Sequence, residues 1–262
     1  MLRSALIVVA TVSLIAFNSP ASSASSENTP GAKVISVTQA PITKGTTVLS
    51  LSVGPNAQIG QLAIADVLTY QGSQPTITAP DGWQLIRDDS TQTTRQSLYM
   101  HTIEANEPAA SWSFSDPVDA QGAVLLLDNV ASDSSIDSTS GNPGSTFVDD
   151  GVDADELPLL GFVSPLVTAK SITTTSDGNL ILAFNATDFG AYRPTLCNGC
   201  SGLNPALPQN ASVVLNQESA NLEYWIVSNY QAQTGPTADQ VSAAPQLFNW
   251  IAAQVAIKPG TP

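Results

Sequence analysis

The fold is decided by the stretch Pro75-Thr76-Ile77-Thr78-Ala79-Pro80-Asp81-Gly82-Trp83-Gln84-Leu85-Ile86. Ile77 and Thr78 suit an extended strand. Pro80-Asp81-Gly82 is a strong turn signal, because proline presets one backbone dihedral and Asp and Gly tolerate the left-handed region. Trp83 then opens a second apolar stretch. We therefore predict antiparallel strands around a buried tryptophan.

Strand patterns continue on both sides of this turn. Thr47–Val53 alternates apolar and polar residues, and Gln61–Leu68 is apolar on both faces, as expected for a central strand. The other segments with strand patterns are Lys33–Gln39, Gln96–Ile103, Ser111–Ser115, Ala123–Leu127, Leu166–Thr175, Leu180–Phe184, Ser212–Gln217, Glu223–Ser228 and Trp250–Ile257. These patterns predict one all-β domain over residues 33–262, an antiparallel two-sheet β-sandwich of jelly-roll type.

The two halves of the chain also resemble each other. We expect an internal duplication of the strand set, with chance similarity of β-strands as the alternative. The matching pairs are Gly60–Ala65 with Gly178–Ala183, Pro75-Thr76-Ile77 with Pro194-Thr195-Leu196, Leu98-Tyr99-Met100 with Tyr224-Trp225-Ile226, and Ala123–Leu127 with Ile251–Val255.

Four elements, in this order, carry a likeness to a known family. They are Gly60–Ala65, Thr78–Trp83, the Leu98-Tyr99 strand, and Glu107-Pro108 before Trp112-Ser113-Phe114. Together they resemble secreted bacterial and phage-associated jelly-roll sandwiches with a concanavalin-like fold, over about Val34 to Ile257. The resemblance implies a fold and an extracellular setting, and it implies no catalytic residues.

The first residues predict export. Met1-Leu2-Arg3 and the apolar run Ala5–Phe17 form the charged and hydrophobic regions of a signal peptide, and Ser22-Ser23-Ala24 supplies small residues for cleavage. The run is too short to span a bilayer, and we expect no membrane span after it. The expectation is a signal peptide over residues 1–24, a flexible linker over 25–32 and a secreted protein, extracellular or periplasmic. An uncleaved N-terminal anchor is the alternative.

The charge balance bears on the partners. The chain has 8 Lys and Arg against 22 Asp and Glu, a formal net charge of −14. Nucleic-acid binding requires clustered basic side chains, so no nucleic-acid partner is expected. Divalent cations remain open, and the simplest interpretation is an acidic surface that keeps the protein soluble.

The two cysteines, Cys197 and Cys200, flank an Asn-Gly pair. In an exported chain the simplest prediction is a single disulfide that staples a loop. A redox site would require the first thiol at a helix start, and a structural zinc site would require four ligands. Both stay open as alternatives.

A long loop is predicted over residues 131–165, and so long a connection is usually functional or disordered. It contains the strongest acidic cluster of the chain, with Asp149, Asp150, Asp153 and Asp155 near Gly151. Closely spaced carboxylates near a glycine can wrap a calcium ion, which prefers six to eight oxygen ligands. The spacing does not match an EF-hand, and a solvated acidic loop is the alternative.

Other candidate residues are less specific. His101 is the only histidine, so a Ser-His-Asp catalytic triad would have to use it. No Gly-x-Ser-x-Gly motif accompanies it, which favours a surface or cross-strand role. Five aromatic residues could form a sugar-stacking platform, but aromatic residues in apolar strands usually belong to the core. They are Trp83, Tyr99, Trp112, Trp225 and Trp250.

The sequence thus predicts a secreted, non-enzymatic binding, adhesion or structural module. Its partner would be a glycan or a cell-surface component, with calcium as an optional cofactor and no catalytic residues assigned. The alternative is a polysaccharide hydrolase or lyase that uses carboxylates on a concave sheet face.

Overall fold

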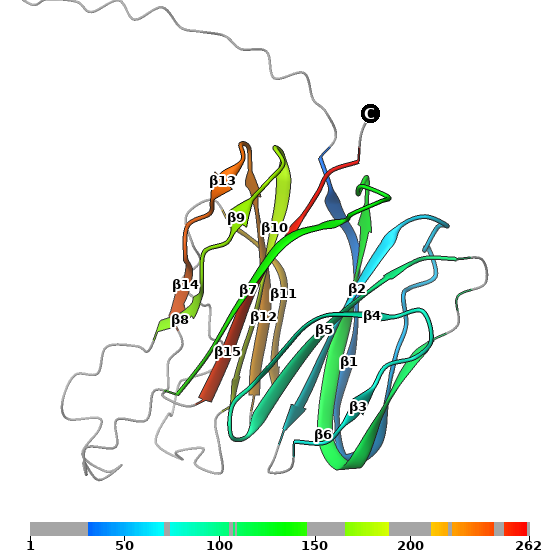
Figure 1. Ribbon diagram of the computed structural model, residues 1–262. Helices are drawn as coiled ribbons and strands as arrows, with labels where there is room; N and C mark the ends of the chain where they lie inside the picture. Colours follow the sequence, from blue (N-terminus) through cyan, green and yellow to red (C-terminus); the bar gives the residue numbers. More distant parts are fainter. Residues whose placement is uncertain are drawn as a thin grey trace, which may run out of the picture.

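The structure is a computed structural model that describes residues 31–70, 74–104, 107, 109–145, 166–188, 211–219, 222–243 and 249–260. The secondary-structure elements in these ranges are all β-strands, as predicted. Most of them form two antiparallel sheets, with the first sheet on the right and the second on the left in Figure 1. Within these ranges, no helix is long and apolar enough to cross a membrane.

The first sheet is built from the N-terminal part of the chain. Its main strands lie in the order β1-β6-β2-β5-β4, and β3 pairs with β6. The strands are β1 (Lys33–Leu51), β2 (Leu62–Tyr70), β3 (Ile77–Thr78), β4 (Gln84–Ser90), β5 (Thr94–Thr102) and β6 (Ala110–Asp128). All nine residues of the central β2 are buried. This confirms the prediction of a central strand from its unbroken apolar pattern.

The second sheet has the order β11-β12-β10-β15-β7. Its strands are β7 (Ile136–Ser145), β10 (Asn179–Asp188), β11 (Ser212–Ser219), β12 (Leu222–Gln231) and β15 (Asn249–Ile257). Two short pairs accompany it: β8 (Leu166–Ala169) with β14 (Gln240–Ala243), and β9 (Thr173–Thr174) with β13 (Gly235–Pro236).

Part of the predicted loop is a strand. β7 lies within residues 131–165 and forms the edge of the second sheet beside β15. An edge strand tolerates glycine and proline, so β7 can contain Gly141 and Pro143 and still pair. Its sequence lacks the apolar alternation by which strands are recognised. Residues 146–165 of the predicted loop lie outside the described ranges.

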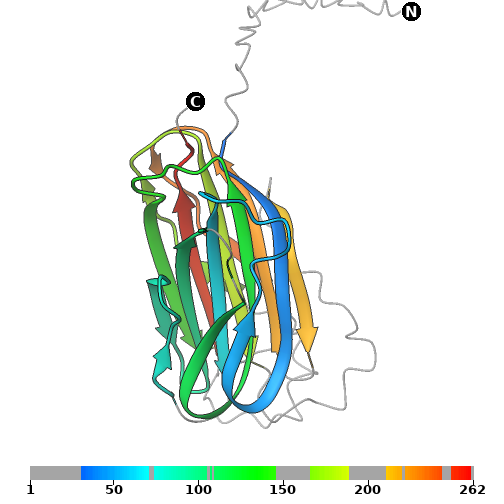
Figure 2. The same cartoon turned by 90° about the vertical axis from the view of Figure 1, so that its right-hand side faces the viewer.

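The two sheets pack face to face through alternate side chains of their strands. Ile64 and Leu125 of the first sheet and Leu182, Phe184 and Val255 of the second belong to one buried cluster. Turned by 90°, the first sheet lies in front of the second (Figure 2). This cluster is the central core of the sandwich.

The outer face of the first sheet is buried as well. The Trp83 ring lies 5.0 Å from that of Trp112 in an edge-to-face arrangement, and Tyr99 lies 5.8 Å from Trp112. Trp83 comes from the predicted turn, where its N–H donates to the Pro80 carbonyl at 3.2 Å and Gly82 has φ of 83°. The prediction of strands around a buried tryptophan is therefore confirmed.

The outer face of the second sheet is covered by the short strands. Val167 and Ala169 of β8 pack in one buried cluster with Trp225 and Trp250. The indole Nε1–H of Trp225 donates to the Ser242 hydroxyl on β14 at 3.1 Å. In Figure 1 these short strands lie to the left of the second sheet as a further layer. The central strands of both sheets are thus buried on both faces.

The connectivity does not confirm a jelly roll. The chain completes the first sheet with β6 before it enters the second sheet with β7. In a jelly roll, Greek-key connections run between the two sheets. The architecture that the structure establishes is the coarser one, an all-β fold of antiparallel sheets.

Candidate functional site

The predicted metal and cysteine sites lie outside the described residues. This applies to Asp149, Asp150, Asp153 and Asp155 and to Cys197 and Cys200. The described residues that precede these two segments, Ser145 and Asp188, lie at the same end of the second sheet, because Ser145 pairs with Asn249 and Thr187 pairs with Trp250. In the part of the chain that the structure describes, no three His, Cys, Asp or Glu side chains come together as a metal site.

His101 clamps the Pro80–Trp83 turn onto the first sheet. Its Nδ1 lies 3.0 Å from the Gly82 carbonyl oxygen, and its Nε2 lies 2.7 Å from a carboxylate oxygen of Glu107. The ring also stacks on Trp83, with 5.2 Å between the centroids. Only 10% of the side chain is exposed. The histidine is therefore a cross-strand structural residue, one of the two roles expected for it.

The protonation of His101 follows from these contacts. Both partner atoms are acceptors, and only the imidazolium ion has a proton on each ring nitrogen. Burial lowers the pKa of His101, but the hydrogen bonds to Glu107 and Gly82 and the nearby carboxylates outweigh it and raise the pKa above its usual value. With both nitrogens engaged, the ring has no free position from which to act as a general base.

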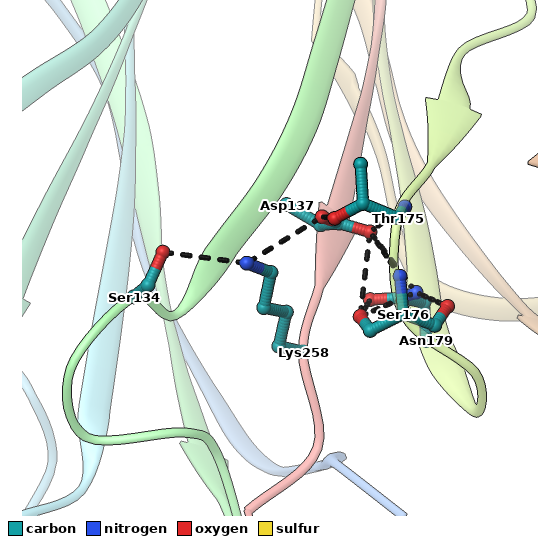
Figure 3. A network of polar contacts seen from close by, with 6 residues as sticks. All are labelled: Ser134, Asp137, Thr175, Ser176, Asn179 and Lys258. Atoms are coloured by element: carbon teal, nitrogen blue, oxygen red, sulfur yellow. Dashed lines mark hydrogen bonds and ion pairs between the residues drawn. The ribbon is translucent and has the colours of Figure 1, made fainter. Parts of the chain in front are cut away.

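Asp137 is the centre of a second polar cluster (Figure 3). Its side chain is 1% exposed. It accepts hydrogen bonds from the Thr175 N–H at 2.6 Å, the Thr175 hydroxyl, the Ser176 N–H and hydroxyl, and the Asn179 amide at 3.2 Å. The Lys258 ammonium lies 3.6 Å away. The cluster joins β7 to the start of β10 and to the end of β15.

The electrostatics of this cluster favour a charged carboxylate. Burial raises the pKa of Asp137, but the donors on Thr175 and Ser176 and the charge of Lys258 outweigh it, so the pKa lies below its usual value. A carboxylate saturated with donors is a poor nucleophile and a poor general base. The cluster is best understood as a structural junction of the second sheet.

A third polar group is buried between the sheets. Asp66 on β2 is fully buried and accepts a hydrogen bond from the Gln96 side-chain amide of β5 at 2.8 Å. Tyr224 of the second sheet lies close to it, and Gln121 donates to the Tyr70 hydroxyl at 3.4 Å nearby on the same sheet. Sequence reasoning missed this group. Its signal was one acidic residue inside the apolar run Gln61–Leu68.

The aromatic residues that could form a sugar-stacking platform are all buried. Trp83, Trp112, Trp225 and Trp250 are 9%, 0%, 0% and 8% exposed, and Tyr99 is 5% exposed. The core interpretation of these residues is confirmed.

Comparisons with known proteins give no further identification: no family model, no curated protein and no solved structure matches the chain.

Proposed function

We propose that the protein is an exported, non-enzymatic binding, adhesion or structural module. The observation that carries the proposal is the burial of the central strands of both sheets on both faces by the chain itself. Leu51, Trp112 and Phe114 are buried on the outside of the first sheet, and Trp225 and Trp250 on the outside of the second. A β-sandwich with covered faces binds through its edges and loops, as many extracellular sandwiches do.

The alternative, a polysaccharide hydrolase or lyase, has less support. It requires two carboxylates on an open concave face, about 5–10 Å apart. Among the described residues, the carboxyl groups of Asp66, Asp89 and Asp137 are buried. Asp66 faces the central core, Asp89 forms an ion pair with Arg87, and Asp137 is saturated with donors at the junction of β7, β10 and β15. None of the three belongs to an acid pair on a sheet face.

The proposal includes the two sites that the sequence predicts in the segments following Ser145 and Asp188. Calcium binding by Asp149, Asp150, Asp153 and Asp155, and a disulfide between Cys197 and Cys200, would each stabilise the segment that contains them. Support comes from the sequence and from the shared position of the preceding strand ends at Ser145 and Asp188. Export to an oxidising compartment would allow the disulfide.

We also propose that the two sheets are duplicated strand sets. The order β4-β5-β2-β6-β1 in the first sheet parallels β11-β12-β10-β15-β7 in the second. A positive-φ glycine precedes both central strands, Gly60 before β2 and Gly178 before β10. Each edge strand also has a register shift at the last core residue of the neighbouring strand. β1 shifts at Leu127 of β6, and β7 shifts at Ile257 of β15.

The strand pairing also refines the alignment of the two halves. When Leu62 is aligned with Leu180, the strands that pair with β2 and β10 can be aligned through their registers. Residues of β5 and β6 then align with residues of β12 and β15 that lie two positions later in the chain than in the sequence match. In this register equivalent residues share the central core. The pairs are Leu98 with Ile226, Ala123 with Ala253, Leu125 with Val255 and Leu127 with Ile257.

A glycan array probed with the protein from residue 25 onward, with and without calcium, tests the proposed function. The same preparation is incubated with soluble polysaccharides, and new reducing ends or unsaturated products are measured. We expect retention on a subset of glycans without turnover. Turnover that scales with protein concentration, and that survives further purification, would contradict the non-enzymatic assignment and favour the hydrolase or lyase.

A further inference from the structure

Asp66 occupies an apolar position of the fold. Side chains of β2 alternate between the faces of the first sheet, and Ile64 and Leu68, two residues to either side, belong to the central core. Asp66 is paired in register with Leu98 on β5 and Ala123 on β6, both of which are buried. At the corresponding position of β10, in the register of Leu62 with Leu180, the second sheet has Phe184.

Among the residues that the structure describes, the carboxyl group of Asp66 has no counter-ion. The groups that influence it are the Gln96 amide on β5 and the Tyr224 hydroxyl on β12, both uncharged. Tyr70, on the same strand, is the further titratable group near Tyr224. The described lysines and arginines that form ion pairs do so with Asp128, Asp89, Asp88, Asp239 and Asp137. An isolated buried carboxylate is so unfavourable that the group takes up a proton instead.

The hydrogen bonds around Asp66 also fit the neutral acid. Gln96 Nε2 donates to Oδ2, whereas Oδ1 of Asp66 and Oε1 of Gln96 are buried acceptors without a partner among the described residues. A carboxylic acid and a primary amide can join through two parallel hydrogen bonds. The amide N–H then donates to the acid carbonyl, and the acid O–H donates to the amide oxygen. A proton on Oδ1 gives both unpartnered oxygens a bond.

We propose that Asp66 is a neutral acid in the folded protein, paired with the Gln96 amide, and that it acts as a pH-sensitive lock between the two sheets. Ionisation places an uncompensated charge against Tyr224 and the apolar side chains of the second sheet. In mildly acidic and neutral solution Asp66 is protonated and the contact between the two sheets is intact, whereas under alkaline conditions Asp66 ionises and this contact is weakened.

The direction of the pH dependence follows from proton linkage. Burial raises the pKa of Asp66 to about 8 and outweighs the opposing effect of the hydrogen bonds from Tyr224 and Gln96. The pKa of an aspartate in an unfolded chain is about 3.9. A group with a raised folded pKa stabilises the fold fully below its unfolded pKa, and this contribution is lost as the pH rises through the folded pKa. The unfolding equilibrium constant is therefore expected to rise about tenfold per pH unit from about pH 5 to about pH 8.

The test is urea unfolding of the full chain between pH 5 and pH 9. We compare the wild type with Asp66→Asn, which keeps the shape without the charge, and with Asp133→Asn at an exposed position as control. Asp66→Asn is expected to lower the unfolding equilibrium constant at pH 8 at least a hundredfold, with a much smaller effect at pH 5. The control should follow the wild type at every pH. An Asp66→Asn profile with the wild-type slope would overturn the proposal.

A second measurement does not depend on a variant that folds. Infrared spectroscopy of the folded wild type should show a protonated carboxyl C=O band that persists at pH 7 and disappears above pH 9. The exposed carboxyl groups have lost their protons at both pH values. Absence of the band at pH 7 would contradict the neutral acid, whatever the variant does.

Discussion

Replacing Trp83 by alanine is expected to lower the free energy of unfolding by about 3–5 kcal/mol, as for other large buried aromatic residues. The indole is 9% exposed, and it packs between His101 and Trp112. The substitution removes the ring that holds the Pro80–Trp83 turn against the first sheet, and it leaves a cavity beside the fully buried Trp112. Chemical denaturation followed by far-ultraviolet circular dichroism measures the change.

The matched control is Leu85→Ala. Leu85 lies on β4, two residues along the chain, but it is 56% exposed. Its removal is expected to change the free energy of unfolding by less than about 0.5 kcal/mol, as for most surface substitutions. Equal effects of the two substitutions would show that Trp83 is not an anchor of the outer layer.

Replacing Asp137 by alanine is expected to cost about 3 kcal/mol at pH 7. The substitution removes the acceptor for the main-chain N–H groups of Thr175 and Ser176, and it leaves the partly buried Lys258 without its counter-ion. Thermal and urea unfolding at pH 7 measure the loss.

Asp239→Ala is the control for burial. Asp239 also accepts a main-chain N–H, from Ser171 at 2.8 Å, and pairs with Lys170 at 3.0 Å, but 38% of its side chain is exposed. We expect a loss below about 1 kcal/mol, as for exposed ion pairs. A loss as large as that of Asp137→Ala would contradict the role assigned to burial.

The Asp137 effect should also depend on pH. Because the folded pKa of Asp137 is lowered, the carboxylate stabilises the fold above its unfolded pKa of about 3.9, and this stabilisation is lost as the pH falls through the folded pKa. The gap between wild type and Asp137→Ala is therefore expected to be constant from about pH 5 upward and to narrow in stronger acid. A gap that widens in acid would contradict the ionic character of the junction.

The sequence predicted those parts of the fold that depend on local patterns. The unbroken apolar run at β2, the Pro80-Asp81-Gly82 turn and the burial of the tryptophans follow from strand periodicity and turn chemistry. The long strands β1 and β6 were predicted only as separate pieces. β1 contains several register shifts against β6, and such irregularities break the alternation on which the prediction depends.

The polar clusters could be predicted only in part. Asp66 left a visible signal, because an acidic residue inside an apolar strand has to face a core. Asp137 left none, since its partners Thr175 and Lys258 are far away in sequence and meet it only when β7, β10 and β15 pair. The role of His101 depended on side-chain contacts with the nearby Glu107 and with the Gly82 carbonyl, which a strand pattern does not reveal.

The aromatic residues build covered layers on the outer side of each sheet's central strands, and among the described residues they form no open sugar platform. All four tryptophans of the chain lie among the described residues, so acrylamide quenching of tryptophan fluorescence tests the claim most directly. We predict weak quenching in the folded protein, strong quenching after unfolding in urea, and no change on addition of oligosaccharides that bind. Strong quenching in the folded state that such oligosaccharides suppress would contradict the account.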